Sequence, residues 1–385
     1  MSKIISVLGA TGSVGLQALD VARTSGYRVD FLSANRDTGR MESLAREFKP
    51  LAVAMADAAA DALRVALADT DIRVLSGEAG IEEGIHASDS QTVVNSILGE
   101  AGLMPSLAVI DSGKRLALAN KESLVIAGDI VMERARGRGC EIIPVDSEHS
   151  AIFQSLRSGR PREIKRLILT ASGGPFFGMT SEQLRRVTLA DTLRHPTWKM
   201  GRKITVDSAT LMNKGFEVIE ACHLFGVSAD RVQVTVHRES ILHSAVEYID
   251  NSVIAELSVP DMRMCVQYAV DYPDRCPSFG EELDLFSVGK LSFARPDTEA
   301  FPFLGLAERA MSLGGAMPAV MNAADEVAVD AFLRERIGFT DIFDVVCESF
   351  ERMLAARACT SLEDIIASDR EARAVSGELI SKINK

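Results

Sequence analysis

A glycine-rich turn between two regular elements constrains the fold of this chain more than any other feature of its sequence. The letters G-A-T-G-S-V-G occupy positions 9–15, directly after the apolar run of residues 4–8. Residues 16–23, which follow, have the apolar spacing of an amphipathic helix. A strand, a G-x-x-G-x-x-G turn and a helix let the backbone approach a pyrophosphate at the helix N-terminus. An ordinary tight turn is the alternative, but this context favours a dinucleotide-binding βαβ unit.

The end of the second expected strand indicates which dinucleotide is bound. An NAD site carries an acidic side chain there, which bonds the ribose 2′-hydroxyl. This chain has Ser33, Ala34, Asn35 and Arg36 instead, and Asp30 lies too early, near the start of the strand. The planar guanidinium of Arg36 suits a 2′-phosphate. The sequence therefore favours NADP over NAD.

The first part of the chain has the rhythm of a parallel sheet. After the first run, further short apolar runs at residues 29–32, 93–98 and 116–118 alternate with helical stretches. Strands that alternate with helices indicate βαβ units. We therefore predict an α/β fold that begins with a Rossmann-like NADPH-binding domain at residues 1–145.

The pattern changes in the next region, residues 146–272. Longer strands with alternating apolar positions appear there, including one through Val232, Val234 and Val236. A polar turn at residues 250–252 separates two apolar segments. This region is predicted to be an α+β catalytic domain that binds metal and substrate and connects the other parts.

The last two regions differ in their content of helix breakers. Proline and glycine punctuate residues 273–303, which leaves no room for a helix longer than two turns and predicts a linker. Residues 304–385 have a helical pattern, with an apolar stripe through Ile342 and Phe350 and a capping-box pattern that begins at Thr360. We therefore predict a C-terminal α-helical domain.

The composition excludes several classes of protein. A formal net charge of -12 opposes nucleic acid or an acidic membrane surface as the main partner. The six cysteines form no C-x-x-C pair, so neither a zinc knuckle nor a disulfide framework is indicated. Neither a signal-peptide pattern nor an apolar run of membrane-spanning length is found. These features predict a cytoplasmic protein with a small-molecule substrate.

Two carboxylates follow an apolar run near the start of the second region. Asp146 and Glu148 have i, i+2 spacing and point the same way if the strand continues through them. Two carboxylates at a strand end favour a hard divalent cation. The alternative is that they are solvated acids that cap a helix at residues 149–156.

A second segment supplies further groups of the same chemistry. Asn213 and Glu217 share a helix face at i, i+4 spacing, and Lys214 and Ser208 flank them. Glu217 is a candidate third oxygen ligand for Mg²⁺ or Mn²⁺. Ser208, Asn213 and Lys214 offer donors of the kind that hold a phosphate.

Two further turns are weaker candidates. Ser172 precedes a glycine pair after an expected strand, and it could place free N–H groups near an anion or form an ordinary turn. The polar segment 195–201 contains Trp198, the only tryptophan of the chain. It is either a mobile lid or a loop anchored by its tryptophan.

Taken together, these segments resemble the 1-deoxy-D-xylulose 5-phosphate reductoisomerase family. The resemblance is carried by the turn at positions 9–15, by the letters L-A-N-K-E-S-L at 118–124, and by residues 145–150, 172–176 and 195–217. It continues through V-P-D-M-R at 259–263 to N-A-A at 322–324. It implies NADPH-dependent rearrangement and reduction of a phosphorylated sugar, 1-deoxy-D-xylulose 5-phosphate, to 2-C-methyl-D-erythritol 4-phosphate in non-mevalonate isoprenoid synthesis.

The resemblance also assigns roles to individual residues. It implies a homodimer, a lid that carries Trp198, and Mg²⁺ or Mn²⁺, with Co²⁺ as an alternative, on Asp146, Glu148 and Glu217. Lys121 and Glu148 are the residues that we expect to handle protons, beside the metal ligands. The implied NADPH site comprises Thr11, Gly12, Ser13, Val14, Asn35, Arg36, Asp37, Asn120, Glu122 and Gly201. The implied substrate contacts are Lys121, Ser147, Glu148, Ser172, His195, Trp198, Ser208, Asn213, Lys214 and Glu217.

Some positions depart from the family pattern. Arg238 and Glu239 stand where Pro and Gln are usual, Ser258 replaces a usual Gly, and Asp325 replaces a usual Asn. Arg36 takes the place of a frequent Lys and keeps the charge. Apart from Arg36, none of these positions is an expected metal or phosphate contact, so the others bear on local packing more than on chemistry.

Two rival functions remain open at this point. One is an NADPH-dependent oxidoreductase of similar build that acts on another phosphorylated hydroxyketone without rearranging its skeleton. The other is a non-catalytic nucleotide sensor, which the intact set of Lys121, Asp146, Glu148 and Glu217 argues against.

Overall fold

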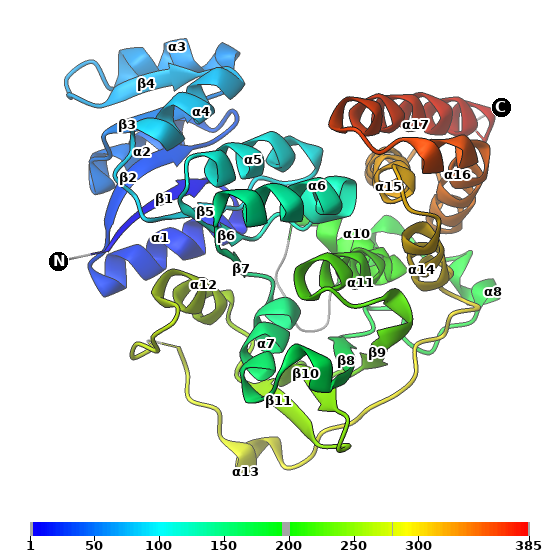
Figure 1. Ribbon diagram of the computed structural model, residues 1–385. Coiled ribbons are helices and arrows are strands. Elements are labelled where there is room, and N and C mark those ends of the chain that lie inside the picture. Colours follow the sequence, from blue (N-terminus) through cyan, green and yellow to red (C-terminus); the bar gives the residue numbers. More distant parts are fainter. Residues whose placement is uncertain (1–2, 195–200, 279, 384–385) are drawn as a thin grey trace. The chain divides into compact units, whose positions relative to one another are not determined.

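The computed structural model describes residues 3–194, 201–278 and 280–383 (Figure 1). The chain divides into two compact units, and each of them is drawn from several stretches of sequence. The first unit comprises Met1–Ser123, Ile130–Ser150 and Asp261–Glu281. The second comprises Leu124–Asp129, Ala151–Pro260 and Glu282–Lys385. They are described separately below.

The first unit contains a seven-stranded sheet with the order β4-β3-β2-β1-β5-β6-β7. Every strand pair in it is parallel. The strand order reverses between β1 and β5, which is where ligands bind in open α/β sheets. The strands are β1 (Ile4–Leu8), β2 (Arg28–Ser33), β3 (Ala52–Met55), β4 (Arg73–Ser76), β5 (Thr92–Asn95), β6 (Arg115–Leu118) and β7 (Ile142–Pro144).

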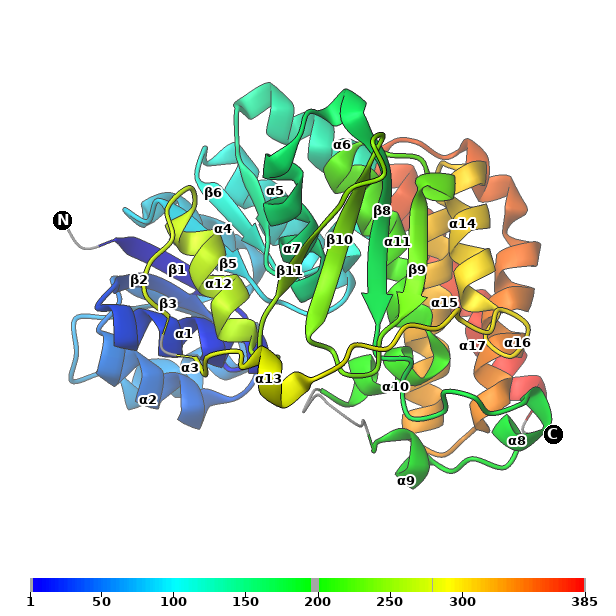
Figure 2. The same ribbon diagram turned by 90° about the horizontal axis from the view of Figure 1, so that it is seen from below.

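Helices connect these strands in the manner of a Rossmann-like fold. Because parallel crossovers are right-handed, consecutive connections on opposite sides of β1 cover opposite faces of the sheet. The last helix of this unit, α12, comes much later in the chain and packs against α1 (Figure 2). The helices are α1 (Ser13–Ser25), α2 (Thr38–Phe48), α3 (Asp57–Ala66), α4 (Gly77–Ala87), α5 (Leu103–Asp111) and α12 (Met262–Asp271).

Two helices contribute residues to both units. Helix α6 (Glu122–Arg138) has a non-helical residue at Ala127, and its segment 124–129 belongs to the second unit. Helix α7 (Ser147–Ser155) changes unit after Ser150.

The second unit is built on a four-stranded mixed sheet with the order β11-β10-β8-β9. Strand β10 is antiparallel to both β11 and β8, whereas β8 and β9 are parallel. The predicted polar turn at residues 250–252 joins β10 to β11, with Asn251 at a φ of 65°. The strands are β8 (Ile164–Ala171), β9 (Val232–Val236), β10 (Leu242–Tyr248) and β11 (Val253–Leu257).

Helices of the second unit cover one face of this sheet and continue into a C-terminal bundle. Buried Val218 and Ala221 of α11 pack with Leu167 and Leu169 of β8. Figure 1 shows α15, α16 and α17 packed together at the end of the chain. The helices are α8 (Ser181–Leu184), α9 (Leu189–Thr192), α10 (Arg202–Thr210), α11 (Met212–Phe225), α13 (Leu285–Val288), α14 (Phe303–Leu313), α15 (Met317–Leu333), α16 (Phe339–Arg352) and α17 (Leu362–Ile383).

Aromatic side chains make up much of the core of the C-terminal helices. The ring of Phe339 lies with its centroid 5.6 Å from that of Phe343 and 5.9 Å from that of Phe332, both edge-on. The predicted apolar stripe is confirmed, because Ile342 and Phe350 are fully buried. Edge-to-face aromatic pairs stabilise a core beyond the area that they bury.

The α/β class with a Rossmann-like N-terminal part is confirmed by this architecture. One alternative is decided and one local prediction was wrong. The strand that precedes Asp146 ends at Pro144, so Glu148 lies in the first turn of α7, as in the alternative that places these acids at the start of a helix, and not on a continued strand. The cap of α17 is Ser361 and not Thr360, since the Ser361 hydroxyl accepts a hydrogen bond from the Asp364 N–H. Among the described helices, none is long and apolar enough to cross a membrane.

Candidate active site

The glycine turn of the first unit is shaped by close backbone contacts. Gly9 has a φ of 77°, and a Cβ there would lie 2.7 Å from the Ser96 carbonyl oxygen at the end of the neighbouring strand β5. A Cβ on Gly15 would overlap the Gly9 carbonyl oxygen. Gly12 is the N-cap of α1 and supplies no side-chain cap, so the first N–H groups of the helix face outward. This geometry fits a pyrophosphate.

The residues expected to contact the adenosine ribose follow β2 directly. Asn35, Arg36 and Asp37 are all exposed. The Asp37 carboxylate caps α2 by accepting a hydrogen bond from the Arg40 N–H, at 3.0 Å. The exposed Arg36 guanidinium is therefore carried by a short, capped connection at the end of β2.

Asp30 does not serve this site, as its early position in the strand predicted. It is buried, and its carboxylate accepts hydrogen bonds from the Asp89 N–H at 2.6 Å and from Arg28 at 3.1 Å. Its role is to hold two neighbouring segments of the first unit together.

Asn120 organises the loop after β5. Its amide nitrogen lies 2.8 Å from the Ile97 carbonyl oxygen, 3.0 Å from that of Gly99 and 2.9 Å from a Glu122 carboxylate oxygen. Its own oxygen accepts a hydrogen bond from the Ser123 N–H at 3.0 Å. Asn120 and Glu122 therefore shape the edge of the sheet where the strand order reverses.

Lys121 and Asp146 form a buried ion pair in the first unit. The Lys121 ammonium lies 2.6 Å from Asp146 Oδ2, and His149 Nδ1 lies 3.6 Å from Asp146 Oδ1. Burial alone would raise the pKa of the Asp146 carboxyl, but Lys121 and His149 hold this pKa well below its usual range. Ser147 donates a hydrogen bond to Glu148 Oε2 at 2.5 Å. Two acidic side chains and one lysine thus gather at the start of α7.

The second unit carries the other predicted acidic ligand. Glu217 is only 1% exposed, and its carboxylate accepts hydrogen bonds from Asn213 at 2.5 Å and from the Lys214 ammonium. The predicted shared helix face is therefore confirmed. Leu211, at a φ of 60°, separates α10 from α11 and sets the direction in which α11 begins.

The Ser172 turn and helix α10 come together in this unit. The Ser172 hydroxyl accepts a hydrogen bond from the Gly174 N–H at 3.3 Å. A Cβ on Gly174, which has a φ of 65°, would lie 2.7 Å from the Ser208 carbonyl oxygen. Ser172 and Ser208, 36 positions apart, are thereby brought to adjoining pieces of backbone. Glycine is required here both for its φ and for the close approach.

Comparisons with known proteins decide the family. Models of three parts of 1-deoxy-D-xylulose 5-phosphate reductoisomerase match residues 5–128, 142–225 and 257–375. The reductoisomerase of Acetivibrio thermocellus is 50% identical over 377 residues, which is 98% of this chain and 99% of that protein. The protein of that name from Ruminiclostridium cellulolyticum is 46% identical over 381 residues, 99% of this chain and 100% of that one. The chain belongs to the 1-deoxy-D-xylulose 5-phosphate reductoisomerase family.

Solved structures of this reductoisomerase family have the same fold. The Zymomonas mobilis enzyme in complex with NADPH is 39% identical, covers 99% of both chains and gives a TM-score of 0.92. A reductoisomerase in complex with NADPH, fosmidomycin and magnesium is 37% identical, covers 100% of this chain and 99% of the other, and gives a TM-score of 0.94.

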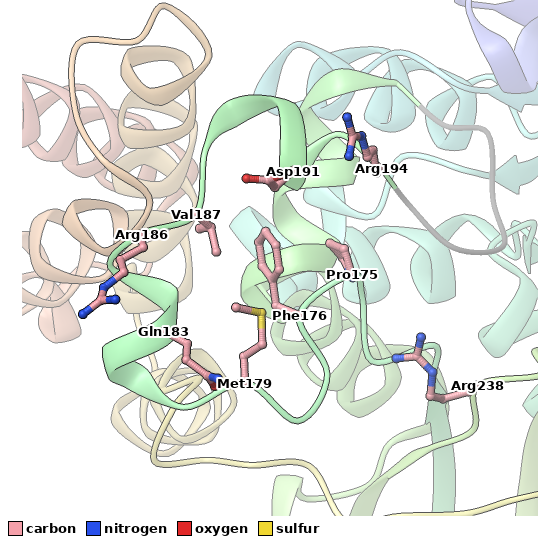
Figure 3. A pocket seen from close by; sticks show the side chains of 9 residues that line it. All are labelled: Pro175, Phe176, Met179, Gln183, Arg186, Val187, Asp191, Arg194 and Arg238. Carbon is pink, nitrogen blue, oxygen red and sulfur yellow. The ribbon is translucent and has the colours of Figure 1, made fainter.

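A pocket of about 490 Å³ lies on the second unit of this reductoisomerase-family chain, beside the Ser172 turn (Figure 3). Phe176 and Met179 point into it, and Arg194 and Arg238 stand at its edge. Arg238, one of the departures from the family pattern, donates a hydrogen bond to the Gly174 carbonyl oxygen at 3.3 Å and lies 5.2 Å from the Phe177 ring centre. Arg238 therefore supports the turn that carries Ser172.

The other departures also have local partners. Glu239 accepts a hydrogen bond from the Ser292 hydroxyl at 2.6 Å, and the Ser258 N–H donates to the Ile241 carbonyl oxygen at 3.1 Å. Asp325 is fully buried and pairs with Lys203. No sequence pattern predicted this pair, because its two residues are 122 positions apart.

Two predicted substrate contacts lie outside the described residues, namely His195 and Trp198. Gly201, the end of the same segment and a predicted cofactor contact, is described and is the N-cap of α10.

Proposed function

We propose that this chain catalyses the NADPH-dependent conversion of 1-deoxy-D-xylulose 5-phosphate to 2-C-methyl-D-erythritol 4-phosphate. The observation that carries the proposal is a match to this family along nearly the whole chain, together with the residues that the chemistry needs. The glycine turn and Arg36 provide for NADPH, and acidic and phosphate-binding side chains provide for metal and sugar phosphate.

The cofactor site proposed here lies at the strand-order reversal of the first unit, where a Cβ would fill the cradle at Gly9 and Gly15. Arg36 is its proposed contact to the 2′-phosphate, for which its exposed guanidinium is suited. Thr11, Gly12, Ser13, Val14, Asn35, Arg36, Asp37, Asn120, Glu122 and Gly201 are the proposed contacts to NADPH.

Asp146, Glu148 and Glu217 are the proposed ligands of one divalent cation, Mg²⁺ or Mn²⁺, with Co²⁺ as an alternative. Their carboxylate oxygens have the chemistry that such hard cations select. Lys121 supports this role, since its ammonium keeps Asp146 ionised in a buried place. When bound, the cation supplies positive charge to substrate oxygens and NADPH supplies a hydride.

The remaining proposed roles belong to the side chains that meet the sugar phosphate. Lys121 and Glu148 are proposed to hold and transfer protons at the substrate oxygens, because a carboxylate and an ammonium at one place can exchange protons with a bound hydroxyl group. Glu217 and Ser147 are proposed to orient the sugar hydroxyls. Ser172, Ser208, Asn213 and Lys214 are proposed to bind the phosphate end, and His195 and Trp198 to cover the substrate.

The chain is further proposed to act as a homodimer. Strand β11 is at the edge of its sheet and pairs with β10 on one side only among the described strands. Its residue Val253 is 51% exposed and Ile254 is 37% exposed. An apolar edge strand is a surface that proteins usually cover. A dimer that is unchanged when Val253 and Ile254 are both replaced by Lys would contradict this use of the edge.

The domain boundaries and the cellular location of the protein are also proposed. The division into a nucleotide domain (1–145), a catalytic domain (146–272), a linker (273–303) and a helical domain (304–385) describes the proposed functional parts. A cytoplasmic location is proposed because the six cysteines are scattered along the sequence without a C-x-x-C pair, a usage that is common in a reducing compartment.

One experiment tests the proposed function directly. Purified protein is incubated with 1-deoxy-D-xylulose 5-phosphate, NADPH and Mg²⁺ or Mn²⁺, and the nicotinamide absorbance is followed with and without EDTA. Absorbance should fall only when metal is present. Carbon-13 NMR of the product should show a branched skeleton. An unbranched product would favour the rival oxidoreductase, and absence of any turnover would favour a nucleotide sensor.

A further inference from the structure

The helix that carries Ser208 is joined to the C-terminal helices by a buried ion pair. Lys203 lies in the first turn of α10, and its ammonium is 2.7 Å from Asp207 Oδ2 and 2.9 Å from Asp325 Oδ2. Asp207 belongs to α10 itself, whereas Asp325 belongs to α15. One carboxylate on the same helix already balances the ammonium charge. The contribution of Asp325 is therefore to connect α10 to α15.

This connection is costly to build. Asp325 is 0% exposed, and removing a carboxylate from water costs several kcal/mol before its partner compensates. Its Oδ1 atom has no hydrogen-bond partner among the residues that the structure describes. Buried ionic groups of this kind contribute little net stability, and their best-attested use is to fix the register of one element against another.

A second contact connects the turn that follows Ser172 to the C-terminal helices. The ring of Phe176, from the turn that follows Ser172, lies 5.0 Å from the ring of Phe339 in α16 and edge-on to it. The turn itself approaches the Ser208 backbone closely at Gly174. Both segments proposed to bind the phosphate therefore rest on the C-terminal helices, one through an ion pair and one through an aromatic pair.

We infer that Asp325, acting through Lys203, is a positioning residue for the phosphate end of the substrate. This inference rests on the proposed function, since it requires Ser208 to bind the phosphate. Asp207 directly precedes Ser208 in α10, so a displacement of the Lys203–Asp207 pair moves the Ser208 backbone with it. Asp325 itself is not proposed to touch the substrate.

The test is a steady-state analysis of Asp325→Ala with 1-deoxy-D-xylulose 5-phosphate, NADPH and Mg²⁺. In this variant Lys203 keeps Asp207 as its partner, so no unpaired charge is left behind, but α10 loses its connection to α15. KM for the sugar phosphate should rise by about tenfold while kcat changes by less than about twofold. Asp325→Asn keeps an oxygen acceptor for Lys203 and should recover most of the affinity.

The chain offers a closely matched control in Asp369→Ala. Asp369 is also buried, lies in α17, and is one of two carboxylates on a single cation. Its partner Arg373 keeps Glu326 at 2.8 Å when Asp369 is removed. The control therefore removes a buried carboxylate from a cation that keeps a second carboxylate, and it does so within the C-terminal helices without touching α10. Its KM for the sugar phosphate should stay within about twofold of the wild type.

A double-mutant cycle with Ser208→Ala separates the possible outcomes. If Asp325 acts through Ser208, then Asp325→Ala should add little in the Ser208→Ala background. The inference would be overturned if Asp325→Ala raised KM by the same factor in the wild type and in Ser208→Ala. It would also be overturned if Asp325→Ala changed KM no more than Asp369→Ala does. Failure of Ser208→Ala itself to raise KM would instead reject the proposed phosphate site. If Asp325→Ala does not fold, Lys203→Gln takes its place in the same cycle with Ser208→Ala, and the same comparison of KM values tests the inference.

Discussion

At the scale of single residues, the proposed preference for NADPH depends on Arg36 more than on the glycine turn. The turn provides for a pyrophosphate, which NADH and NADPH share. Arg36 is exposed at the end of β2, and Asp30, the acid nearest to it in the strand, is occupied by Asp89 and Arg28. In the proposed cofactor site, a preference for the 2′-phosphate therefore depends on the guanidinium group of Arg36.

Replacing this group should change the preference without damaging the fold. Arg36→Ala is expected to raise KM for NADPH by about 10- to 100-fold, which is the range for losing one or more charge-assisted hydrogen bonds. KM for NADH should stay nearly unchanged. The measurement is kcat/KM with each cofactor. Arg64→Ala, an exposed arginine of α3, serves as the control. An equal loss with both cofactors would refute the assignment of Arg36 to the 2′-phosphate.

Glu217 is the residue at which nucleotide binding and catalysis should separate. Its carboxylate is buried with Lys214 and Asn213 in the second unit, whereas the glycine turn belongs to the first. Glu217→Gln should lower metal-dependent kcat by about a hundredfold or more, as for other groups that act on charge in the transition state. NADPH binding, measured by nucleotide fluorescence, should persist. Turnover equal to that of the wild type would remove Glu217 from the metal site.

At the scale of elements, the turn between β8 and α8 shows how a local backbone conformation can serve a distant helix. Gly174 has a φ of 65° and would clash with the Ser208 carbonyl oxygen if it carried a Cβ. Gly178 has a φ of 82° but nothing within 4 Å of its expected Cβ position. Both glycines therefore have a left-handed backbone in which an alanine would be strained, and they differ in their neighbours.

This pair gives a prediction with its own control. Gly174→Ala should raise KM for the sugar phosphate by about tenfold or more, because the turn and α10 have to move apart. Gly178→Ala should cost about 1 kcal/mol of stability from its left-handed backbone, with little change in KM. Similar KM values for both variants would show that the approach of the turn to Ser208 has no part in substrate binding.

Sequence patterns predicted these elements better than their ends and contacts. The i, i+4 spacing of Asn213 and Glu217 was sufficient because both lie on one helix, whose geometry is fixed. The i, i+2 spacing of Asp146 and Glu148 left a continued strand and a helix N-terminus both open, and the structure has the helix, because Pro144 ends the strand and α7 begins at Ser147. Alternation specifies a strand only while the strand lasts, and a residue or two decides which geometry applies.

At the scale of the whole molecule, the division into units does not follow the order of the sequence. Helix α12 comes after most of the second unit's sheet but belongs to the first unit, where Asp271 accepts hydrogen bonds from Lys3 and from the Tyr27 hydroxyl, both at 2.6 Å. Its apolar periodicity predicts a helix and carries no information about its partner. The pairing of Lys203 with Asp325 was beyond prediction for the same reason.

The second unit contains a buried histidine that should govern its stability toward acid. His243 of β10 is 5% exposed, and burial lowers the pKa of its imidazole to about 4 from the ordinary value of 6.5. Between these two pH values the unfolded chain binds a proton at His243 that the folded chain does not. The free energy of unfolding should therefore fall as the pH drops from 6.5 to 4, by about 3 kcal/mol for this group, with no contribution above that window.

Urea unfolding at intervals between pH 4 and pH 7 measures this effect. His243→Gln removes the titrating group, so its stability should vary less with pH across the window than that of the wild type, even if the variant is less stable at pH 7. His86→Gln, at an exposed position of α4 in the first unit, controls for the loss of a histidine. Parallel curves for the wild type and His243→Gln would mean that the folded imidazole takes up its proton as readily as the unfolded one. The core around β10 would then not require a neutral imidazole at His243.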